Sequence, residues 1–241
     1  MLVGITRVRN ESLIIADTIC HFLGWCDCIV LYDDCSTDDT VARAREVGGN
    51  RLHVIAGDQW LTERQAEETR HRRIAHEFAL SLGADWCLCF DADERLVGKL
   101  PDLNGDGFRF RLFDAYLTED RQQAYAGGDL AELPRMWGPE FRDILMLFRA
   151  DKALYKGVDL REPVLKGNIS FTPVMVKHFG KCLSIDHWEE TCDYYARFFP
   201  EPYRSKWNGR RGKAIHQKSD FGRELYTWTE LMRQSAQWQR I

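Results

Sequence analysis

Five consecutive apolar residues, Trp86 to Phe90, are followed at once by the acidic segment Asp91-Ala92-Asp93-Glu94. A short apolar run bounded by charge is typical of a strand that is buried on both faces, as in a parallel sheet covered by helices. In open α/β sheets, ligands bind just beyond the carboxyl ends of the strands. Two carboxylates one residue apart can reach one hard divalent cation, so Asp91 and Asp93 are candidate metal ligands. A solvated acidic turn or a helix cap is the alternative interpretation.

Strands and helices alternate along the first part of the chain. Apolar strands are expected at residues 2–6, 28–32 and 52–55, and the segments between them have the apolar spacing of helices. These helices are expected from Leu13 to Leu23, from Thr40 through Arg45 and from about Thr62 to Leu82. Strands joined by crossover helices form parallel sheets. The sequence therefore predicts a Rossmann-like α/β fold, with a mostly parallel central sheet flanked by helices.

Polar side chains stand at the carboxyl end of each of these strands. Because the carboxyl ends of parallel strands meet at one edge of a sheet, we expect these side chains to form one pocket. Acidic groups there can accept hydrogen bonds from ribose hydroxyls or base N–H groups, and a cation on Asp91 and Asp93 would neutralise a diphosphate. The pocket therefore suits a nucleoside diphosphate, and its other candidate residues are Thr6, Arg9, Glu11, Asp33, Asp34 and Asp58.

Three arginines, Arg70, Arg72 and Arg73, lie in one helical turn ahead of the fourth strand. They could place positive charge near a diphosphate, or they could form a solvated helix face. The glycine-rich nucleotide motifs are absent: the chain has no G-x-x-x-x-G-K-[ST] segment, and the first loop lacks G-x-G-x-x-G.

Composition and charge exclude several classes of protein. A net charge of -4 argues against a protein that binds nucleic acid by neutralising its phosphates. No run approaches the ~20 apolar residues of a membrane span, and no signal-peptide pattern precedes the first strand. We therefore expect a cytoplasmic protein without a membrane span. The eight cysteines lie mostly in apolar segments and show no C-x-x-C pair, which favours reduced core thiols over disulfides or a structural zinc site.

Three motif segments follow one another along the chain, each at an expected strand end. They are Val8-Arg9-Asn10-Glu11, then Asp33-Asp34-Cys35-Ser36-Thr37-Asp38-Asp39-Thr40, and then Ala84-Asp85-Trp86 leading to Asp91-Ala92-Asp93-Glu94. Together they resemble the family 2 glycosyltransferases of the GT-A fold. The resemblance covers about the first hundred residues well and the rest loosely. Asp38-Asp39 stands where the family usually has Asp-Gly, a departure within a turn that both pairs tolerate.

The resemblance implies a hexosyltransferase-type enzyme that moves a sugar from a nucleotide-diphosphate sugar to a hydroxyl of a glycan or other acceptor, in glycan or polysaccharide biosynthesis. It implies Mn²⁺ or Mg²⁺ as the cofactor. Asp33 or Asp34, together with Asp58, would hold the nucleoside, and Asp91 would contact the ribose or the metal. Asp93 would be the direct metal ligand of a DXD motif.

The resemblance also implies a single GT-A domain over residues 1–241. We divide it into a nucleotide-binding half at 1–95, an acceptor-binding half at 96–220 and a C-terminal helix at 221–241. In the second half, strands are expected at 107–113 and 144–149, and the polar segment 114–138 between them is expected to be a mobile loop. Residues 192–199 have the apolar spacing of a helix.

The resemblance places a catalytic carboxylate and a late histidine in this second half. We nominate Glu162 as the general base of an inverting transfer, and His178 as a third metal ligand or a diphosphate contact. A structural role is the alternative for His178. Lys213 belongs to the basic loop 210–216, which could fold over the diphosphate leaving group or form a solvated turn. The competing candidates are Asp143, Glu140 and Asp159 for the base, and His216 for the histidine.

Two other functions remain open at this point. A nucleotidyltransferase would use a similar sheet and metal but attack the α-phosphate of a nucleotide, and the lack of a glycine-rich basic loop after the first strand weighs against it. A catalytically silent module that binds a nucleotide or a sugar is the second alternative. The acids Asp91 and Asp93 argue against that module but leave it open.

Overall fold

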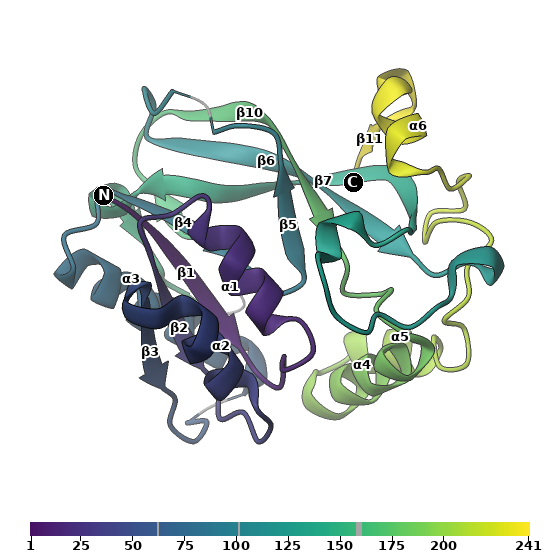
Figure 1. The fold of residues 1–241 in the computed structure, drawn as a ribbon, viewed down its shortest axis with the longest axis horizontal. Helices are drawn as coiled ribbons and strands as arrows, with labels where there is room; N and C mark the ends of the chain where they lie inside the picture. Colours follow the sequence, from purple (N-terminus) through teal and green to yellow (C-terminus); the bar gives the residue numbers. More distant parts are fainter. Residues whose placement is uncertain (62, 101, 158–160) are drawn as a thin grey trace. The chain divides into compact units, whose positions relative to one another are not determined.

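The computed structural model describes residues 1–61, 63–100, 102–157 and 161–241. Figure 1 shows the order of the elements along the chain. The helices are α1 (Ile15–Leu23), α2 (Thr40–Gly48), α3 (Arg64–Ser81), α4 (Ile185–Phe198), α5 (Tyr203–Asn208) and α6 (Trp228–Arg233). The strands are β1 (Leu2–Val8), β2 (Cys28–Asp33), β3 (Leu52–Ala56), β4 (Trp86–Phe90), β5 (Glu94–Val97), β6 (Gly107–Tyr116), β7 (Met136–Arg149), β8 (Ala153–Leu154), β9 (Val164–Leu165), β10 (Ile169–His178) and β11 (Gln239–Arg240).

The chain forms two compact units, and each unit is built from several segments. Unit 1 contains Met1–Glu94, Gly98–Phe110 and Ile144–Val174. Unit 2 contains Arg95–Val97, Arg111–Asp143 and Met175–Ile241. Strands β6, β7 and β10 contribute residues to both units. This organisation differs from the expected division at residue 95, because the chain returns to unit 1 twice after that point.

The parallel part of the sheet lies in unit 1. β1 pairs with β2 from Val3–Cys28 to Val8–Asp33 and with β4 from Leu2–Trp86 to Thr6–Phe90, and β2 pairs with β3, all in parallel. β7 then joins β4 in the antiparallel direction. The strand order of the sheet is β3-β2-β1-β4-β7-β6-β10-β5, with β11 parallel to β7. The expected α/β fold, with a central sheet flanked by helices, is confirmed.

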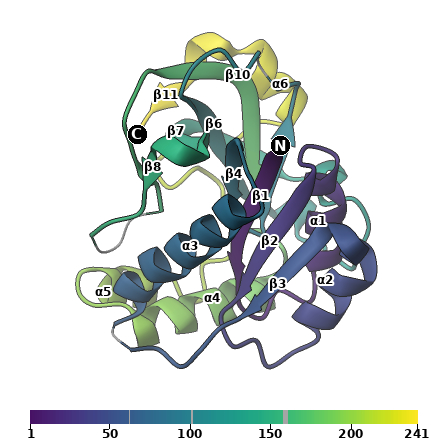
Figure 2. The same ribbon diagram turned by 90° about the vertical axis from the view of Figure 1, so that its left-hand side faces the viewer.

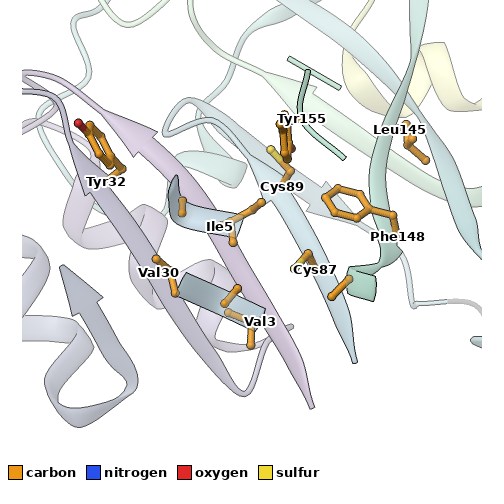
Figure 3. Packing of buried hydrophobic residues seen from close by; sticks show 12 residues of the cluster. Val3, Ile5, Val30, Tyr32, Cys87, Cys89, Leu145, Phe148 and Tyr155 are labelled. Atoms are coloured by element: carbon orange, nitrogen blue, oxygen red, sulfur yellow. The ribbon is translucent and has the colours of Figure 1, made fainter. Parts of the chain in front are cut away.

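Both faces of β1, β2 and β4 are buried, because alternate side chains point to opposite faces and helices cover each face. Figure 2 shows α3 on one face and α1 with α2 on the other. On the α3 face, Val3, Ile5 and Cys87 belong to a buried cluster that also contains Ala75 and Ala79 of α3 (Figure 3).

The α1 face is packed around an aromatic pair. The rings of Phe22 and Phe90 stack with centroids 3.5 Å apart, and both side chains are fully buried. Gly4 of β1 leaves room for this pair, since a Cβ atom at that position would lie 3.0 Å from the Phe90 ring. The apolar run Trp86 to Phe90 is therefore buried on both faces, as expected.

Two strands are longer than expected. β6 continues to Tyr116 and β7 begins at Met136, so the expected loop at 114–138 contains the ends of both strands. The segment between them includes 3-10 turns at Glu119–Arg121 and Leu130–Glu132. Gly138 and Pro139 hid the start of β7 in the sequence, because both residues are unfavourable in a strand interior.

The expected C-terminal helix at 221–241 is wrong. Only Trp228–Arg233 is α-helical, a 3-10 turn follows at Ser235–Gln237, and the chain ends with strand β11, which pairs with Glu140 and Phe141. The reason is aromatic packing inside unit 2. The rings of Trp228 and Trp238 lie 5.9 and 5.2 Å from the ring of Phe113, and such contacts outweigh local helix propensity.

All eight cysteines are free thiols, as expected. The buried ones are Cys26, Cys87, Cys89, Cys182 and Cys192. Over the described ranges, the structure contains no helix that is both long and apolar enough to cross a membrane.

Replacing Phe22 by alanine tests the packing of the α1 face. Phe22→Ala removes a fully buried ring from its stack with Phe90, so the free energy of unfolding should fall by about 3–5 kcal/mol in urea unfolding. Phe78→Ala is the matched control, because Phe78 is 37% exposed on α3. Its loss should be well below half of that of Phe22→Ala. Equal losses would contradict the packing described for this face.

Candidate functional site

The loops that follow β1 and β2 are joined by hydrogen bonds between side chains and backbone. Asn10 Oδ1 accepts from the backbone N–H of Thr37 at 2.8 Å, and the backbone N–H of Asn10 donates to Ser36 Oγ at 3.0 Å. The backbone N–H of Glu11 donates to Thr40 Oγ1 at 2.8 Å. Asn10 has a φ of 55°, a conformation that asparagine adopts more readily than most residues. The first two motif segments of the sequence are therefore one connected structure.

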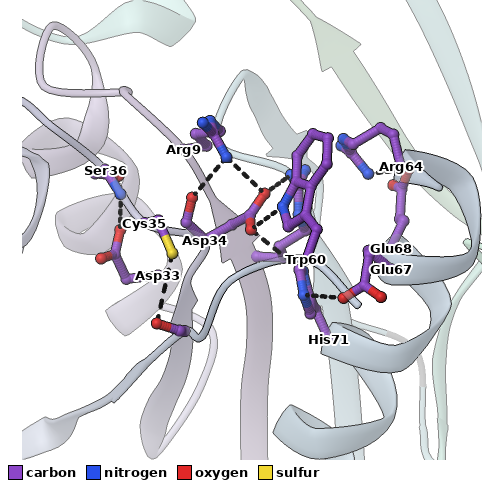
Figure 4. Close-up of polar contacts among 12 residues, drawn as sticks. Arg9, Asp33, Asp34, Cys35, Ser36, Trp60, Arg64, Glu67, Glu68 and His71 are labelled. Carbon is purple, nitrogen blue, oxygen red and sulfur yellow. Dashed lines mark hydrogen bonds and ion pairs between the residues drawn. The ribbon is translucent and has the colours of Figure 1, made fainter. Parts of the chain in front are cut away.

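Asp34 is the centre of a buried network in this structure (Figure 4). Its carboxylate is fully buried, forms an ion pair with Arg7 and accepts the indole N–H of Trp60 at 2.8 Å. Arg9 donates to the backbone carbonyl of Asp34 at 3.2 Å. Burial would raise the pKa of Asp34, but Arg7 and the Trp60 N–H more than offset this and hold the pKa below its usual range. Asp34 therefore anchors the two loops, and its burial closes it to direct contact with a ligand.

Trp60 lies between two arginines, as Figure 4 shows. The guanidinium carbons of Arg9 and Arg64 are 5.1 and 5.9 Å from the centre of the Trp60 ring. Cation–π attraction at this range stabilises a cation over an indole. Trp60 therefore holds positive charge beside the loop of Asp34, at the carboxyl end of the sheet.

His71 extends the network toward the core. Its ring stacks on Tyr32 with centroids 4.2 Å apart, and its Nε2 atom lies 3.2 Å from the Glu67 carboxylate. Burial lowers the pKa of His71 to about 4, although nearby Asp34 favours the charged form. His71 is therefore neutral near pH 7, and the charge of Asp34 is balanced by Arg7.

The turn after β4 is held in place from two sides. Thr18 of α1 donates its hydroxyl to the carbonyl oxygen of Ala92 at 2.6 Å. Glu94 is fully buried, accepts the backbone N–H of Asp91 at 3.0 Å, and lies 2.6 Å from Arg161. The segment that carries Asp91 and Asp93 is therefore a fixed turn, not a loosely solvated one.

Two arginines contact Asp91. Arg72 of α3 lies 2.7 Å from one carboxylate oxygen and Arg161 lies 3.2 Å from the other. Arg72 is buried and also approaches Glu68 and the thiol of Cys89, each at 3.1 Å. Arg72 therefore places positive charge near the end of the fourth strand, as the sequence suggested it could.

Glu11, in the loop after β1, is influenced by the two acids that follow β4. Burial raises the pKa of Glu11 well above its usual value, and the negative charges of Asp93 and Asp91 raise it further. Arg7 opposes this shift only in part. A site in which acids repel one another gains stability when a cation binds among them.

The donor set fits a cation that is shared with a substrate. Among the residues that the structure describes, no group of three His, Cys, Asp or Glu side chains could hold a metal ion. Mg²⁺ is commonly held by one or two carboxylates together with substrate phosphates and water. Asp93 and Asp91 match that pattern, with Asp91 already paired to arginines.

The other expected residues at the strand ends differ in exposure. Thr6 is buried, and its hydroxyl has no hydrogen-bond partner within the described part of the chain. Asp33 is also buried and accepts the backbone N–H of Ser36 at 3.2 Å. Asp58 and Arg73 are exposed. The exposure of Arg73 fits the alternative of a solvated helix face.

The candidates for the general base lie in different places. Glu162 belongs to unit 1 and forms a two-pronged ion pair with Arg109, at 2.9 and 3.3 Å. Asp143 and Glu140 belong to unit 2, where Asp143 lies 2.8 Å from Arg240 and Glu140 accepts the hydroxyl of Ser219 at 2.8 Å. Asp159 lies outside the described residues, as does Thr62, the expected start of α3.

The histidine candidates and Lys213 belong to unit 2. His178 Nδ1 lies 2.6 Å from the carboxylate of Asp114. His216 Nδ1 lies 2.9 Å from the carbonyl of Ala214, and burial lowers the pKa of His216. Lys213 is exposed and donates to the carbonyl of Gly209 at 2.7 Å.

Sequence reasoning missed four residues that build the site in unit 1: Arg7, Thr18, Trp60 and Arg161. Arg7 stands directly before the first motif segment, and Arg161 directly precedes Glu162. Their positions next to candidate residues are the signal that could have identified them. Thr18 gives no signal in the sequence, because its partner Ala92 is 74 residues away. Trp60 follows Asp58 closely, but nothing in the sequence shows which side of the loop it covers.

No family model matches the chain, and neither does any curated protein. Several solved structures resemble it. Glucosyl-3-phosphoglycerate synthase from Mycobacterium tuberculosis, solved with Mn²⁺, UDP and glucosyl-3-phosphoglycerate, is 21% identical with a TM-score of 0.30, over 39% of this chain and 34% of that one. The match thus spans about a third of that synthase.

Two further structures match over nearly their whole length. A 4-diphosphocytidyl-2C-methyl-D-erythritol synthase from Anaerococcus prevotii DSM 20548 is 10% identical with a TM-score of 0.36, over 98% of this chain and 97% of that one. A protein described as a nucleotide-diphospho-sugar transferase, from Desulfovibrio desulfuricans G20, is 11% identical with a TM-score of 0.32, over 100% and 98%. At such values the comparisons identify neither reaction nor substrate, so the function has to be argued from the residues.

Replacing Asp34 by asparagine tests the buried network. Asp34→Asn leaves Arg7 without its partner charge, so the free energy of unfolding at pH 7 should fall by about 3–5 kcal/mol. The folded pKa of Asp34 lies below the unfolded value of about 3.9, so its stabilisation is present above that pH and is lost as the pH falls through the folded pKa. The difference between wild type and variant should therefore shrink below about pH 4.

Urea unfolding at pH 7 and at pH 3 measures this difference. Asp102→Asn is the control, because Asp102 is an exposed aspartate of the same unit, and its effect should stay within about 0.5 kcal/mol. A difference between wild type and Asp34→Asn that is the same at both pH values would contradict the network.

Proposed function

We propose that this chain is a metal-dependent glycosyltransferase of the GT-A fold, which moves a sugar from a nucleotide-diphosphate sugar to an acceptor hydroxyl. The observation that carries the proposal is the position of Asp91 and Asp93 in a fixed turn directly after β4, with Arg72 and Arg161 beside Asp91. A cation bound among these acids would face the diphosphate of a nucleotide in the same pocket.

The nucleoside end of the pocket is assigned to the loops after β2 and β3. The backbone N–H of Gly57 donates to the carbonyl of Asp33 at 2.8 Å, so these two loops are joined. Asp58 follows directly and is exposed, which leaves its carboxylate able to accept from ribose hydroxyls or base N–H groups. In this assignment Asp34 positions the loop and does not touch the donor.

The metal end is assigned to Asp93. A bound Mn²⁺ or Mg²⁺ would neutralise the diphosphate and stabilise the charge that develops on it as it leaves. Asp91 holds Arg72 and Arg161 next to that position, at 2.7 and 3.2 Å from its carboxylate. Both arginines would add to the stabilisation of a departing diphosphate.

Glu162 stays our candidate for the general base. Its ion pair with Arg109 orients the carboxylate, and 27% of its side chain is exposed, so an acceptor hydroxyl can reach it. The rival Asp143 is only 4% exposed and is paired with Arg240. An inverting transfer needs a carboxylate within hydrogen-bond reach of the attacking hydroxyl.

Binding of nucleotides to Asp93→Asn tests the proposed donor site. Calorimetric titration of the wild type with UDP, GDP and dTDP, each with Mn²⁺, should show metal-dependent binding of one of them. Asp93→Asn should bind that nucleotide at least about tenfold more weakly, because it loses the charge of a metal ligand. Asp102→Asn should bind like the wild type.

The outcomes separate the candidate functions. Failure of every nucleotide to bind, or equal binding by Asp93→Asn, would contradict the donor site. Binding of nucleoside triphosphates but not diphosphates would favour a nucleotidyltransferase instead.

Kinetics of Glu162→Gln test the catalytic base. With the donor that the titration identifies, kcat for release of the nucleoside diphosphate should fall by about 10²–10⁴, while the donor affinity stays near that of the wild type. Arg109→Gln is the matched variant, because it breaks the same ion pair and keeps the carboxylate. A merely structural pair would make both variants lose stability and kcat to the same extent.

A further inference from the structure

Unit 2 contains a pocket of its own, with a volume of about 480 Å³. The segment from Gly209 to Asp220 forms most of its lining, and Trp188 of α4 completes it. Arg210, Lys213 and Lys218 all line the pocket, whereas Asp220 is the one carboxylate among the lining residues that the structure describes. A small cavity with this lining suits a ligand that carries negative charge.

The carboxylate that lines the pocket and the one linked to it through Lys181 are each shared between several cations. Asp220 lies 2.6 Å from Lys181 and 2.9 Å from Arg210. Lys181 also reaches Asp114 at 2.9 Å, and Asp114 in turn pairs with Arg142 at 2.6 Å. Asp220 and Asp114 therefore balance three cations between them. Lys213 and Lys218 add further positive charge.

The remaining acids near the loop do not cancel this excess. Asp193 pairs with Arg211 at 2.6 Å, so that couple is neutral. Glu189 accepts the backbone N–H of Gly212 at 2.8 Å and adds one negative charge beside the loop. Lys213 donates to the carbonyl of Gly209, which is a neutral acceptor.

The pKa of Lys206 reflects the same positive surroundings. Partial desolvation lowers this pKa, and repulsion from Arg210, Lys181 and Arg142 lowers it further, although Asp220 opposes them. A bound anion would relieve this repulsion. A dianion would relieve it more than a carboxylate with a single charge, so a phosphate group is the better match.

The wall of the pocket is rigid. The indole N–H of Trp188 donates to the carbonyl of Arg210 at 3.0 Å, and the guanidinium of Arg210 lies 4.9 Å from the ring of Trp207. The ring of His216 packs edge-on against Trp188 with centroids 5.2 Å apart. The position of Arg210 is therefore fixed before a ligand arrives, which lowers the entropy cost of binding.

We infer that the unit 2 pocket binds the phosphate group of a small anionic ligand, with Arg210, Lys213 and Lys218 as its charged contacts. The inference rests on the proposed function for its meaning, since the acceptor of such a transferase would then be a phosphorylated molecule.

Titration with inorganic phosphate tests the pocket in the intact protein. The wild type should bind phosphate at low ionic strength, and Arg210→Gln and Lys213→Gln should each weaken binding by about tenfold, the loss of one charge-assisted hydrogen bond. Arg211→Gln is the matched control, because it removes the same charge from the same loop at a residue that pairs with Asp193. Its affinity for phosphate should stay within about twofold of the wild type, because Arg211 is not one of the proposed phosphate contacts.

Two measurements distinguish a loss of phosphate binding from a folding defect. They are phosphate binding by Arg210→Lys and thermal unfolding of each variant. Arg210→Lys keeps the charge, so it should retain more affinity than Arg210→Gln. Absence of phosphate binding to the folded wild type, or equal weakening by all three glutamine variants, would overturn the inference.

A second titration tests whether a phosphorylated acceptor is the source of the phosphate group. Lys213→Gln should weaken phosphate binding and leave binding of the nucleoside diphosphate near that of the wild type. Equal weakening of both would overturn the assignment to an acceptor. The proposed function fails on a different result, namely nucleotide binding that Asp93→Asn leaves unchanged.

Discussion

The register of β1 against β2 and β4 decides where each polar group of the unit 1 site lies. Val8 is opposite Asp33, so β1 and β2 end together, whereas β4 ends at Phe90, opposite Thr6. A shift by one residue would exchange the two faces of β1, so that the side chains packed under α3 would point toward α1 and the reverse. The cores under α3 and α1 therefore fix the register, and with it the positions of the acids.

Buried charge is the second constraint, and it divides the acids of the motifs by role. Asp34 and Glu94 are fully buried and have arginine partners, so they hold loops in place. Removing one partner of such a pair costs more than the pair contributes, because the other charge stays buried. Asp91 also has arginine partners, but 30% of its side chain is exposed. Asp91 is therefore open to a ligand, whereas the fully buried Asp34 is not.

The sequence allowed the parallel strands and the acids at their ends to be predicted, because both depend on local patterns. Apolar runs identify the strands, and the strand-end rule then groups the acids. The partners of those acids could not be predicted, since the contacts from Thr18 to Ala92 and from Arg161 to Glu94 span 74 and 67 residues. The same limit hid β11, whose place depends on pairing with Glu140 and Phe141.

The two histidine candidates show why order along the chain is a weak guide to role. Nδ1 of His178 lies 2.6 Å from Asp114, so any bond from His178 to a ligand has to use Nε2. Histidines that bind metals or phosphates commonly have such a carboxylate behind the ring, which fixes its orientation and raises its basicity. His216 has a backbone carbonyl in that position and is packed against Trp188 in the unit 2 pocket. The ring of His178 is therefore oriented by a carboxylate, whereas that of His216 is held by a backbone carbonyl and by aromatic packing.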